Sequence, residues 1–286
     1  MTSATTHHQD PSPRRYEPQE QLDTLIKVRA SLEPGVSVFW WEGSVYSFVP
    51  DRPDLSQEIF TMRGINVGRA IPTERGYDLL TREAAFYGDP HTGTLLTQWN
   101  PSIIGGPDRD LPVIPVWNDP VNARFARECP DGPFSVPLQD LGNGMICLSM
   151  DVFLAYPSPI PRDQYPAHSG SNMYQGAELF QFFVNKEHLA DPHMPSAPAS
   201  ISWTRIGQWL PWMEMGERPG YLVYQCRGAK TIGEFQGVDP QVILTIQDEH
   251  PEFLEPPSLF TRPNQTSWRY YREHYLGADQ RLPHDG

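Results

Sequence analysis

The sequence is short of cysteine, of basic residues and of long apolar runs. Its 286 residues include three cysteines, an odd number without CxxC spacing, which argues against a disulfide framework and a zinc ribbon. Lysine and arginine total 22 against 35 aspartates and glutamates, and the net charge of −13 disfavours nucleic acid and anionic membranes as partners. No stretch approaches the roughly 20 apolar residues of a transmembrane helix.

Several catalytic signatures are also missing. The sequence has no G-x-S-x-G elbow, no GxxxxGK[ST] loop, no G-x-G-x-x-G opening a helix and no H-E-x-x-H. His188 and His193 flank Pro192 in a predicted loop, which makes a metal site there improbable. Nicotinamide, flavin, nucleotide hydrolysis and zinc proteolysis therefore lack support, and we expect neither a cofactor nor a metal. Residues 1–9 show neither the basic nor the apolar region of a signal peptide, so a cytoplasmic location is expected.

Proline, glycine and aromatic residues are, by contrast, plentiful. The chain has 31 prolines and 22 glycines, which together stay below the share of about 25–30% typical of disordered chains. It also has 8 tryptophans, 12 tyrosines and 13 phenylalanines, and disordered chains are poor in such residues. Many short strands separated by proline and glycine turns account for this composition.

The chain divides into a polar start and one folded domain. Residues 1–18 contain hardly any apolar side chains, which predicts a flexible tail. We find no internal repeat and no linker that would split residues 19–286, so a single domain is expected. Helical patterns cover residues 19–32, residues 241–249 after the Asp239-Pro240 start signal, and residues 267–276 after a Ser267 cap.

Between these helices the sequence shows strand after strand. Residues 35–49 are expected to form a hairpin that turns at Glu42 and Gly43. The other extended segments are residues 58–71, 77–87, 94–99, 111–125, 145–156, 173–184, 199–210 and 221–231. Their spacing leaves no room for parallel crossovers. About nine or ten antiparallel strands predict a barrel-like sheet around a pocket, with one N-terminal and two C-terminal helices, and a two-sheet sandwich is the alternative.

Strand alternation identifies the first candidate site residue. In residues 145–156 one face is wholly apolar, and the other holds Cys147, Asp151 and Phe153. A phenylalanine and a cysteine on the second face suggest enclosure, which makes Asp151 a candidate buried carboxylate. The alternative is an aspartate at the rim that accepts backbone hydrogen bonds.

The next strand carries a second carboxylate among aromatic side chains. Tyr174, Glu178, Phe180 and Phe182 share one face of residues 173–184. A carboxylate in such surroundings tends to have a raised pKa and can act as a general acid or base. A structural ion pair with an arginine is an equally good interpretation.

Tryptophans gather around one arginine in residues 200–215. Trp203, Arg205 and Trp209 share one face, and Trp212 follows a Leu-Pro break. An arginine between indoles presents a planar fork to a carboxylate or an enolate-like oxygen. The tryptophans favour the wall of an apolar ligand pocket, and plain core packing explains them equally well.

The remaining polar candidates are scattered. Arg63 and Asn66 lie on the strand with bend-forming glycines, and Arg82 and Glu83 lie on the next one. Trp99 and Asn118 stand where strands meet prolines, a place that favours turns over chemistry. Among the histidines, His168 is the best candidate to overhang the mouth of a pocket.

Longer motifs resemble a known family. NPSIIGG, VWNDPVN, MYQGAELFQFF, SWTRIGQWLPWMEMGERPG and REAAFYGDPHTGTLLTQW are similar to a bacterial and fungal family, the domain-of-unknown-function family 1838. The similarity runs over residues 19–256. Many bacterial relatives carry a twin-arginine export signal, which this sequence does not show. Some fungal relatives occur among natural-product tailoring enzymes, so the resemblance implies a small organic substrate, but it brings no established catalytic residues.

Two functions follow from these patterns. The first is a cofactor-independent enzyme that cyclises, isomerises or dehydrates a small apolar metabolite of polyketide or terpenoid type. Glu178 or Asp151 would move the proton, Arg205 would stabilise negative oxygen charge, and Tyr174 would donate a hydrogen bond. The pocket residues would be Trp203, Trp209, Trp212, Phe182, Trp99, Arg63 and Asn66, with His168 near the chemistry. The alternative is a lipocalin-like carrier without catalysis, and a homodimer is left open.

Overall fold

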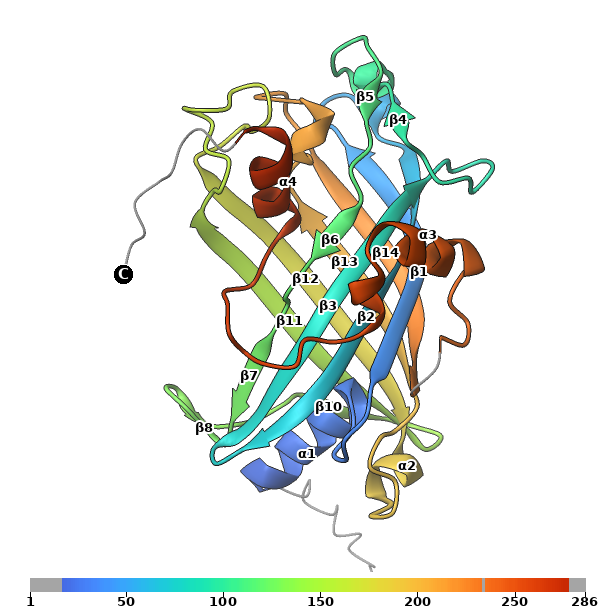
Figure 1. Ribbon diagram of the computed structural model, residues 1–286, viewed down its shortest axis with the longest axis vertical. Helices are drawn as coiled ribbons and strands as arrows, with labels where there is room; N and C mark the ends of the chain where they lie inside the picture. Colours follow the sequence, from blue (N-terminus) through green and yellow to red (C-terminus); the bar gives the residue numbers. More distant parts are fainter. Residues whose placement is uncertain (1–16, 233–234, 278–286) are drawn as a thin grey trace, which may run out of the picture.

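One antiparallel sheet dominates the fold (Figure 1). The computed structural model describes residues 17–232 and 235–277, and ten strands belong to this sheet. They follow the order β10-β11-β12-β13-β14-β1-β2-β3, and both β6 and β7 pair with β3 at the far edge. The strands are β1 (Ser37–Phe48), β2 (Glu58–Thr73), β3 (Gly76–Gly88), β6 (Val116–Asn118), β7 (Ala123–Ala126), β10 (Leu138–Gly142), β11 (Met145–Pro157), β12 (Met173–Asn185), β13 (Ala199–Gly207) and β14 (Tyr221–Ile232). The predicted mainly β, antiparallel fold is confirmed.

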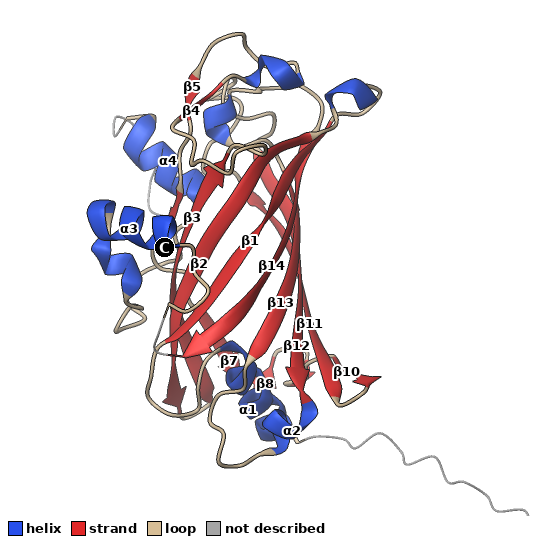
Figure 2. Cartoon of the chain, turned by 90° about the vertical axis from the view of Figure 1, so that its right-hand side faces the viewer, coloured by secondary structure: helices blue, strands red, loops and turns tan. Residues whose placement is uncertain are grey.

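Four helices and two short ribbons of the described chain surround this sheet. The helices are α1 (Pro18–Arg29), α2 (Lys186–Ala190), α3 (Pro240–Glu249) and α4 (Ser267–Tyr275), and two small ribbons pair β4 (Gln98–Trp99) with β5 (Leu111–Pro112) and β8 (Glu128–Cys129) with β9 (Gly132–Pro133). Helices α1 and α2 lie at one end, and β4 and β5 lie at the other (Figures 1 and 2). None of the helices in the described ranges has the length and apolarity to span a membrane. The predicted tail falls almost wholly on residues 1–16, outside the described residues.

The sheet is strongly curved, so that strands far apart in its order face each other. Strands β3 and β12 are separated by four strands, yet Glu83 of β3 and Glu178 of β12 line the same two cavities. Within the described part of the chain no pairing joins β10 to β6 or β7, so the sheet does not close into a barrel. The strands also form one continuous sheet rather than the two sheets of a sandwich.

Two apolar cores explain why β3 has no wet face. Ala85 and Tyr87 point into the concave interior, where they join the main core. Ala84 and Phe86 point outward and pack beneath α3 and the turn that follows it. Because a covering helix buries the outer face as well, the strand is apolar on both sides.

A buried lysine anchors the first helix to the sheet. Lys230 Nζ, on β14, donates hydrogen bonds to the carbonyl oxygens of Lys27 at 2.5 Å and Ala30 at 3.1 Å, and to Ser196 Oγ at 2.9 Å. These carbonyls lie at the C-terminal end of α1, where backbone acceptors lack partners within the helix. The lysine therefore fixes the end of α1 against the inside of the sheet.

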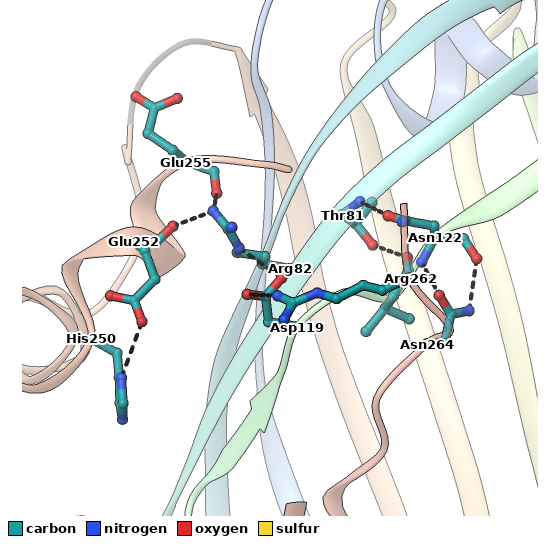
Figure 3. Close-up of polar contacts among 10 residues, drawn as sticks. Thr81, Arg82, Asp119, Asn122, His250, Glu252, Glu255, Arg262 and Asn264 are labelled. Carbon is teal, nitrogen blue, oxygen red and sulfur yellow. Dashed lines mark hydrogen bonds and ion pairs between the residues drawn. The ribbon is translucent and has the colours of Figure 1, made fainter. Parts of the chain in front are cut away.

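The segment between α3 and α4 crosses the outer side of β3 and is held there by polar contacts (Figure 3). Arg82 donates to the carbonyl oxygens of Glu252 and Glu255, both at 2.8 Å. Asn264 and Asn122 exchange two hydrogen bonds of 2.7 and 2.8 Å. Beyond this segment, α4 packs against β6 and places Trp268 edge-on to Tyr174 of β12. The C-terminal helix thus covers the seam that the sheet leaves open.

Several local predictions need correction. The segment 35–49 contains a single strand, β1, and no hairpin, since Glu42 and Gly43 continue the ladder with β14. Gly43 allows a close approach there, because a Cβ at this position would overlap the main-chain oxygen of Gln225. The segment 111–125 is broken into β5, β6 and β7, since its prolines cannot continue a strand ladder. Helix α4 is capped by Thr266, one residue before the predicted cap, and α2 was not predicted.

Candidate functional site

A polar cluster lies inside the curved sheet, surrounded by aromatic side chains. Glu178 and Arg205 are direct cross-strand partners on β12 and β13, and both point into the concave interior. Strand alternation puts Tyr174 on the same face of β12, four positions before Glu178. From the opposite wall, β3 contributes Glu83 and β6 contributes Asn118.

Arg205 is the centre of this cluster. Its guanidinium donates a hydrogen bond of 2.5 Å to the Tyr174 hydroxyl, and its Nε lies 3.7 Å from Glu178 Oε1. The guanidinium also lies over the Tyr224 ring, 5.2 Å from the centroid. Although burial opposes the charge, Tyr174, Tyr224 and Glu178 raise the pKa of Arg205 well above its ordinary value. Arg205 therefore stays cationic, and its pair with Tyr174 leaves the tyrosine O–H free to donate.

Glu83 is the group in the cluster with a tuned proton affinity. Burial and the repulsion of Glu178 raise the pKa of Glu83 to about 7, against the opposing effect of Arg205 and of the Asn118 hydrogen bond. Asn118 Nδ2 donates to Glu83 Oε1 at 3.3 Å. The carboxyl group keeps part of its surface open because it borders two cavities. A carboxyl group of this pKa exchanges protons readily at neutral pH.

Two cavities meet at Glu83, Glu178 and Trp203. The smaller measures about 70 Å³ and is bordered by Tyr174, Arg205 and, from α4, Trp268. The larger measures about 180 Å³ and extends toward α1, where it reaches Arg29. Aromatic and aliphatic side chains, Phe39, Trp41, Phe180 and Ile201, make up most of its wall. The interior thus combines an apolar chamber with ionisable groups, as small-molecule sites do.

The structure brings together part of the predicted site. Glu178, Arg205, Tyr174 and Trp203 surround the cavities, and Asn66 borders the larger one. These residues lie on inward-facing positions of three strands, β2, β12 and β13. Whether they act on a ligand stays a prediction.

The expectation that Asp151 is enclosed is wrong. Asp151 is exposed on the outer face of β11, and Phe153 beside it is 77% exposed. The apolar face of the strand, with Leu148 and Leu154, is the one that points inward. An outward phenylalanine therefore misled the interpretation, because it signals exposure here and not a second buried face. Arg63 is also outside the cavities, on the outer face of β2, where it pairs with Asp239 at the start of α3.

The other predicted residues close the end of the sheet near β4 and β5. Trp212 and Trp99 pack with Phe60. Trp209 donates through Nε1 to the carbonyl oxygen of Arg218 at 3.0 Å. The His168 ring nitrogen Nδ1 lies 3.1 Å from the Pro211 carbonyl oxygen. All four residues are part of the packing at this end of the sheet, and none of them borders either cavity: Trp99, His168, Trp209 and Trp212.

Phe182 lies at the other side of the core. It is fully buried and packs edge-on to Phe39, with ring centroids 5.7 Å apart. The Arg29 guanidinium lies over the Phe182 ring, 5.2 Å from its centroid. Its contact with the site is therefore indirect.

Sequence reasoning counted Glu83 only among scattered polar candidates, interpreted Asn118 as a turn residue and did not consider Arg29. A signal for Arg29 was present, since Leu22, Ile26 and Arg29 recur at positions i, i+4 and i+7 of α1 and so share its buried face. Glu83 lies two residues before inward-pointing Ala85 and so shares its face, in a strand that is apolar on both sides. Glu83 and Arg29 are thus charged residues at positions that face the core.

The comparisons with known proteins identify a family. A search of curated proteins gave no match. The family model for proteins of unknown function, DUF1838, matches residues 35–275, which is most of the chain and all of the sheet. This chain therefore belongs to the DUF1838 family, as its motifs indicated.

Proposed function

We propose that the protein is an enzyme that moves protons on a small, largely apolar metabolite held in the barrel-like interior of the sheet. The proposal rests on Glu83. Its carboxyl group has a pKa of about 7, borders two cavities and lies opposite the permanently charged Arg205. An ionisable group tuned to neutral pH, next to a fixed cation, is the arrangement that proton abstraction beside a carbonyl needs.

The chemistry follows from the positions of these groups. Ionised Glu83 accepts a proton from carbon next to a carbonyl, and the electron pair moves onto the carbonyl oxygen. The resulting enolate is stabilised by Arg205 and by a hydrogen bond from Tyr174. In an isomerisation the electron pair then moves through a neighbouring C=C bond, and protonated Glu83 gives its proton to the far carbon of that bond. In a dehydration the electron pair forms a new C=C bond as the C–O bond of a β-hydroxyl group breaks, and Glu83 gives its proton to this group, which leaves as water. No oxidant or reductant is required in either case.

The cavity limits the size of the substrate. An engineered protein cavity of about 150 Å³ binds benzene. The larger cavity here, about 180 Å³, therefore suits a compact molecule with one ring or a short branched chain better than an extended polyketide. Its apolar wall favours a hydrophobic body, and its ionisable end favours a carbonyl.

A carrier function is the second candidate, and the Glu178–Arg205 ion pair favours it. The separation of 3.7 Å between Arg205 Nε and Glu178 Oε1 means that these two charges already compensate each other. A site whose charges are satisfied can hold a ligand without converting it. The two candidates differ in whether the bound molecule leaves changed.

Incubation with a metabolite extract, followed by mass spectrometry, separates them. We expect conversion of one small carbonyl compound by the natural chain and its loss in Glu83→Gln, because the amide cannot accept the proton. Glu58→Gln, at an exposed glutamate on β2, serves as the matched control and should retain turnover. Retention of an unchanged compound would favour the carrier, and full activity of Glu83→Gln would remove Glu83 from the mechanism.

A further inference from the structure

Arg29 is a charged side chain at the inner end of the larger cavity. It is the last residue of α1, and its guanidinium lies 5.8 Å from the Phe39 ring centroid and 5.2 Å from that of Phe182. Its Nε is buried and has no hydrogen-bond partner among residues 17–232 and 235–277. No carboxylate in those ranges forms an ion pair with it, although Glu83 acts on it electrostatically. A buried cation without a counter-charge is costly unless something supplies one.

The other unsatisfied groups around this cavity point to the same kind of occupant. Four lining residues have buried polar atoms without a partner in the described part of the chain, and each of those atoms is a donor: Arg29 Nε, Trp41 Nε1, Asn122 Nδ2 and Trp203 Nε1. None of the lining residues has a buried side-chain acceptor left open there. A ligand that complements this surface must therefore accept hydrogen bonds.

Asn122 borders the cavity, and its side chain is held through its amide oxygen while Nδ2 has no partner in the described part of the chain. Its Oδ1 accepts from the Thr81 backbone N–H at 3.1 Å, and its own backbone groups pair with Asn264. These contacts fix the orientation of the amide (Figure 3). The open Nδ2 is thus a built feature of the wall and not a freely rotating surface group.

We infer that the larger cavity binds a small organic monocarboxylate, with its carboxylate at Arg29 and its apolar body against Phe39, Phe180 and Ile201. The planar guanidinium matches a carboxylate with two parallel hydrogen bonds. A doubly charged phosphate fits less well, because Glu83 and Glu178 border the same space and repel a second negative charge.

This inference deepens the proposed function and rests on the same cavity. If both hold, the substrate is a compact acid that also carries a carbonyl. The carboxylate would bind toward α1, and the reacting carbon would lie near Glu83. Binding through Arg29 can nevertheless be tested without any turnover.

Calorimetric titration of the full chain with phenylacetate, and with phenylacetamide as a neutral control, tests the inference. We expect phenylacetate to bind at least about tenfold more tightly than the amide. In Arg29→Met the affinity for phenylacetate should fall at least about 30-fold, the loss typical when one partner of a buried charge pair is removed. Arg227→Met removes an arginine whose side chain is 83% exposed on β14 and should bind like the natural chain.

Three results would overturn the inference: equal binding of acid and amide, unchanged binding by Arg29→Met, or no binding of phenylacetate in the millimolar range. Should Arg29→Met fail to fold, Arg29→Lys retains the charge without the fork and should keep the preference for the acid at reduced affinity. If phenylacetate does not bind the natural chain while turnover still depends on Glu83, this inference alone is rejected. If phenylacetate binds through Arg29 and no compound is converted, the proposed catalysis is rejected and the binding site remains.

Discussion

Glu83 should make the stability of the protein fall as the pH rises from about 4.5 to about 7. Burial beside Glu178 raises its pKa from 4.5 to about 7 in the folded protein. Below pH 4.5 the group is protonated in both the folded and the unfolded chain, and its full contribution to stability is present. Between the two values only the unfolded chain ionises, which favours unfolding. Above about pH 7 the contribution is lost.

The size of this effect follows from the two pKa values. The difference between 4.5 and about 7 corresponds to roughly 3 kcal/mol of unfolding free energy. Glu83→Gln resembles the protonated side chain at every pH and can still accept the hydrogen bond from Asn118. The variant should therefore match the natural chain near pH 4 and exceed its stability by roughly 3 kcal/mol near pH 8.

Urea unfolding of both chains across this pH range measures the difference directly. Other groups titrate in the same range, but they do so in both chains and cancel when the two curves are subtracted. Glu58→Gln provides the control for loss of an exposed carboxylate on β2. A flat difference curve for Glu83→Gln would refute the reasoning, since it would show that the carboxyl group titrates normally. Glu178→Gln should shift the transition to lower pH because it removes the repulsion.

Two further predictions concern stability. In the absence of ligand, the free energy of unfolding of Arg29→Met should be about 1–4 kcal/mol higher than that of the natural chain, because an uncompensated buried charge is replaced by an apolar side chain. Thermal unfolding with and without phenylacetate measures this difference. A destabilised Arg29→Met would mean that the charge is satisfied within the fold. Gly43→Ala should cost about 3 kcal/mol or more because its methyl group would force β1 and β14 apart. A Cβ at Gly35 would meet only the main-chain oxygen of Glu33, at 4.0 Å, so Gly35→Ala should be nearly neutral in denaturant titration.

Local patterns predicted the long strands and one wall of the site well. Alternation placed Glu178 and Tyr174 on one face of β12 and Trp203 and Arg205 on one face of β13, and the register of these strands puts Glu178 directly opposite Arg205. Period-two reasoning works here because each strand has one face in the core.

The opposite wall was beyond such reasoning. Glu83 meets Glu178 only because the sheet curves through the four strands between them, and no local pattern reports the order or curvature of a sheet. Arg29 reaches the same interior from a helix at the end of the sheet, about 150 residues before Glu178 in the chain. Asp151 failed for a related reason: the exposed Phe153 beside it imitates the composition of a buried face.

The position of α4 across the open seam has a consequence for how the smaller cavity is enclosed. Thr266, Ser267 and Trp268 border this cavity, so its wall is made partly by a helix and its cap and not by the sheet alone. Helix α4 contacts β6 through side chains and, among the described residues, pairs with no strand. A substitution that weakens this packing, such as Trp268→Ala, would therefore expose the cavity to solvent and leave the hydrogen-bonded ladder of the sheet intact.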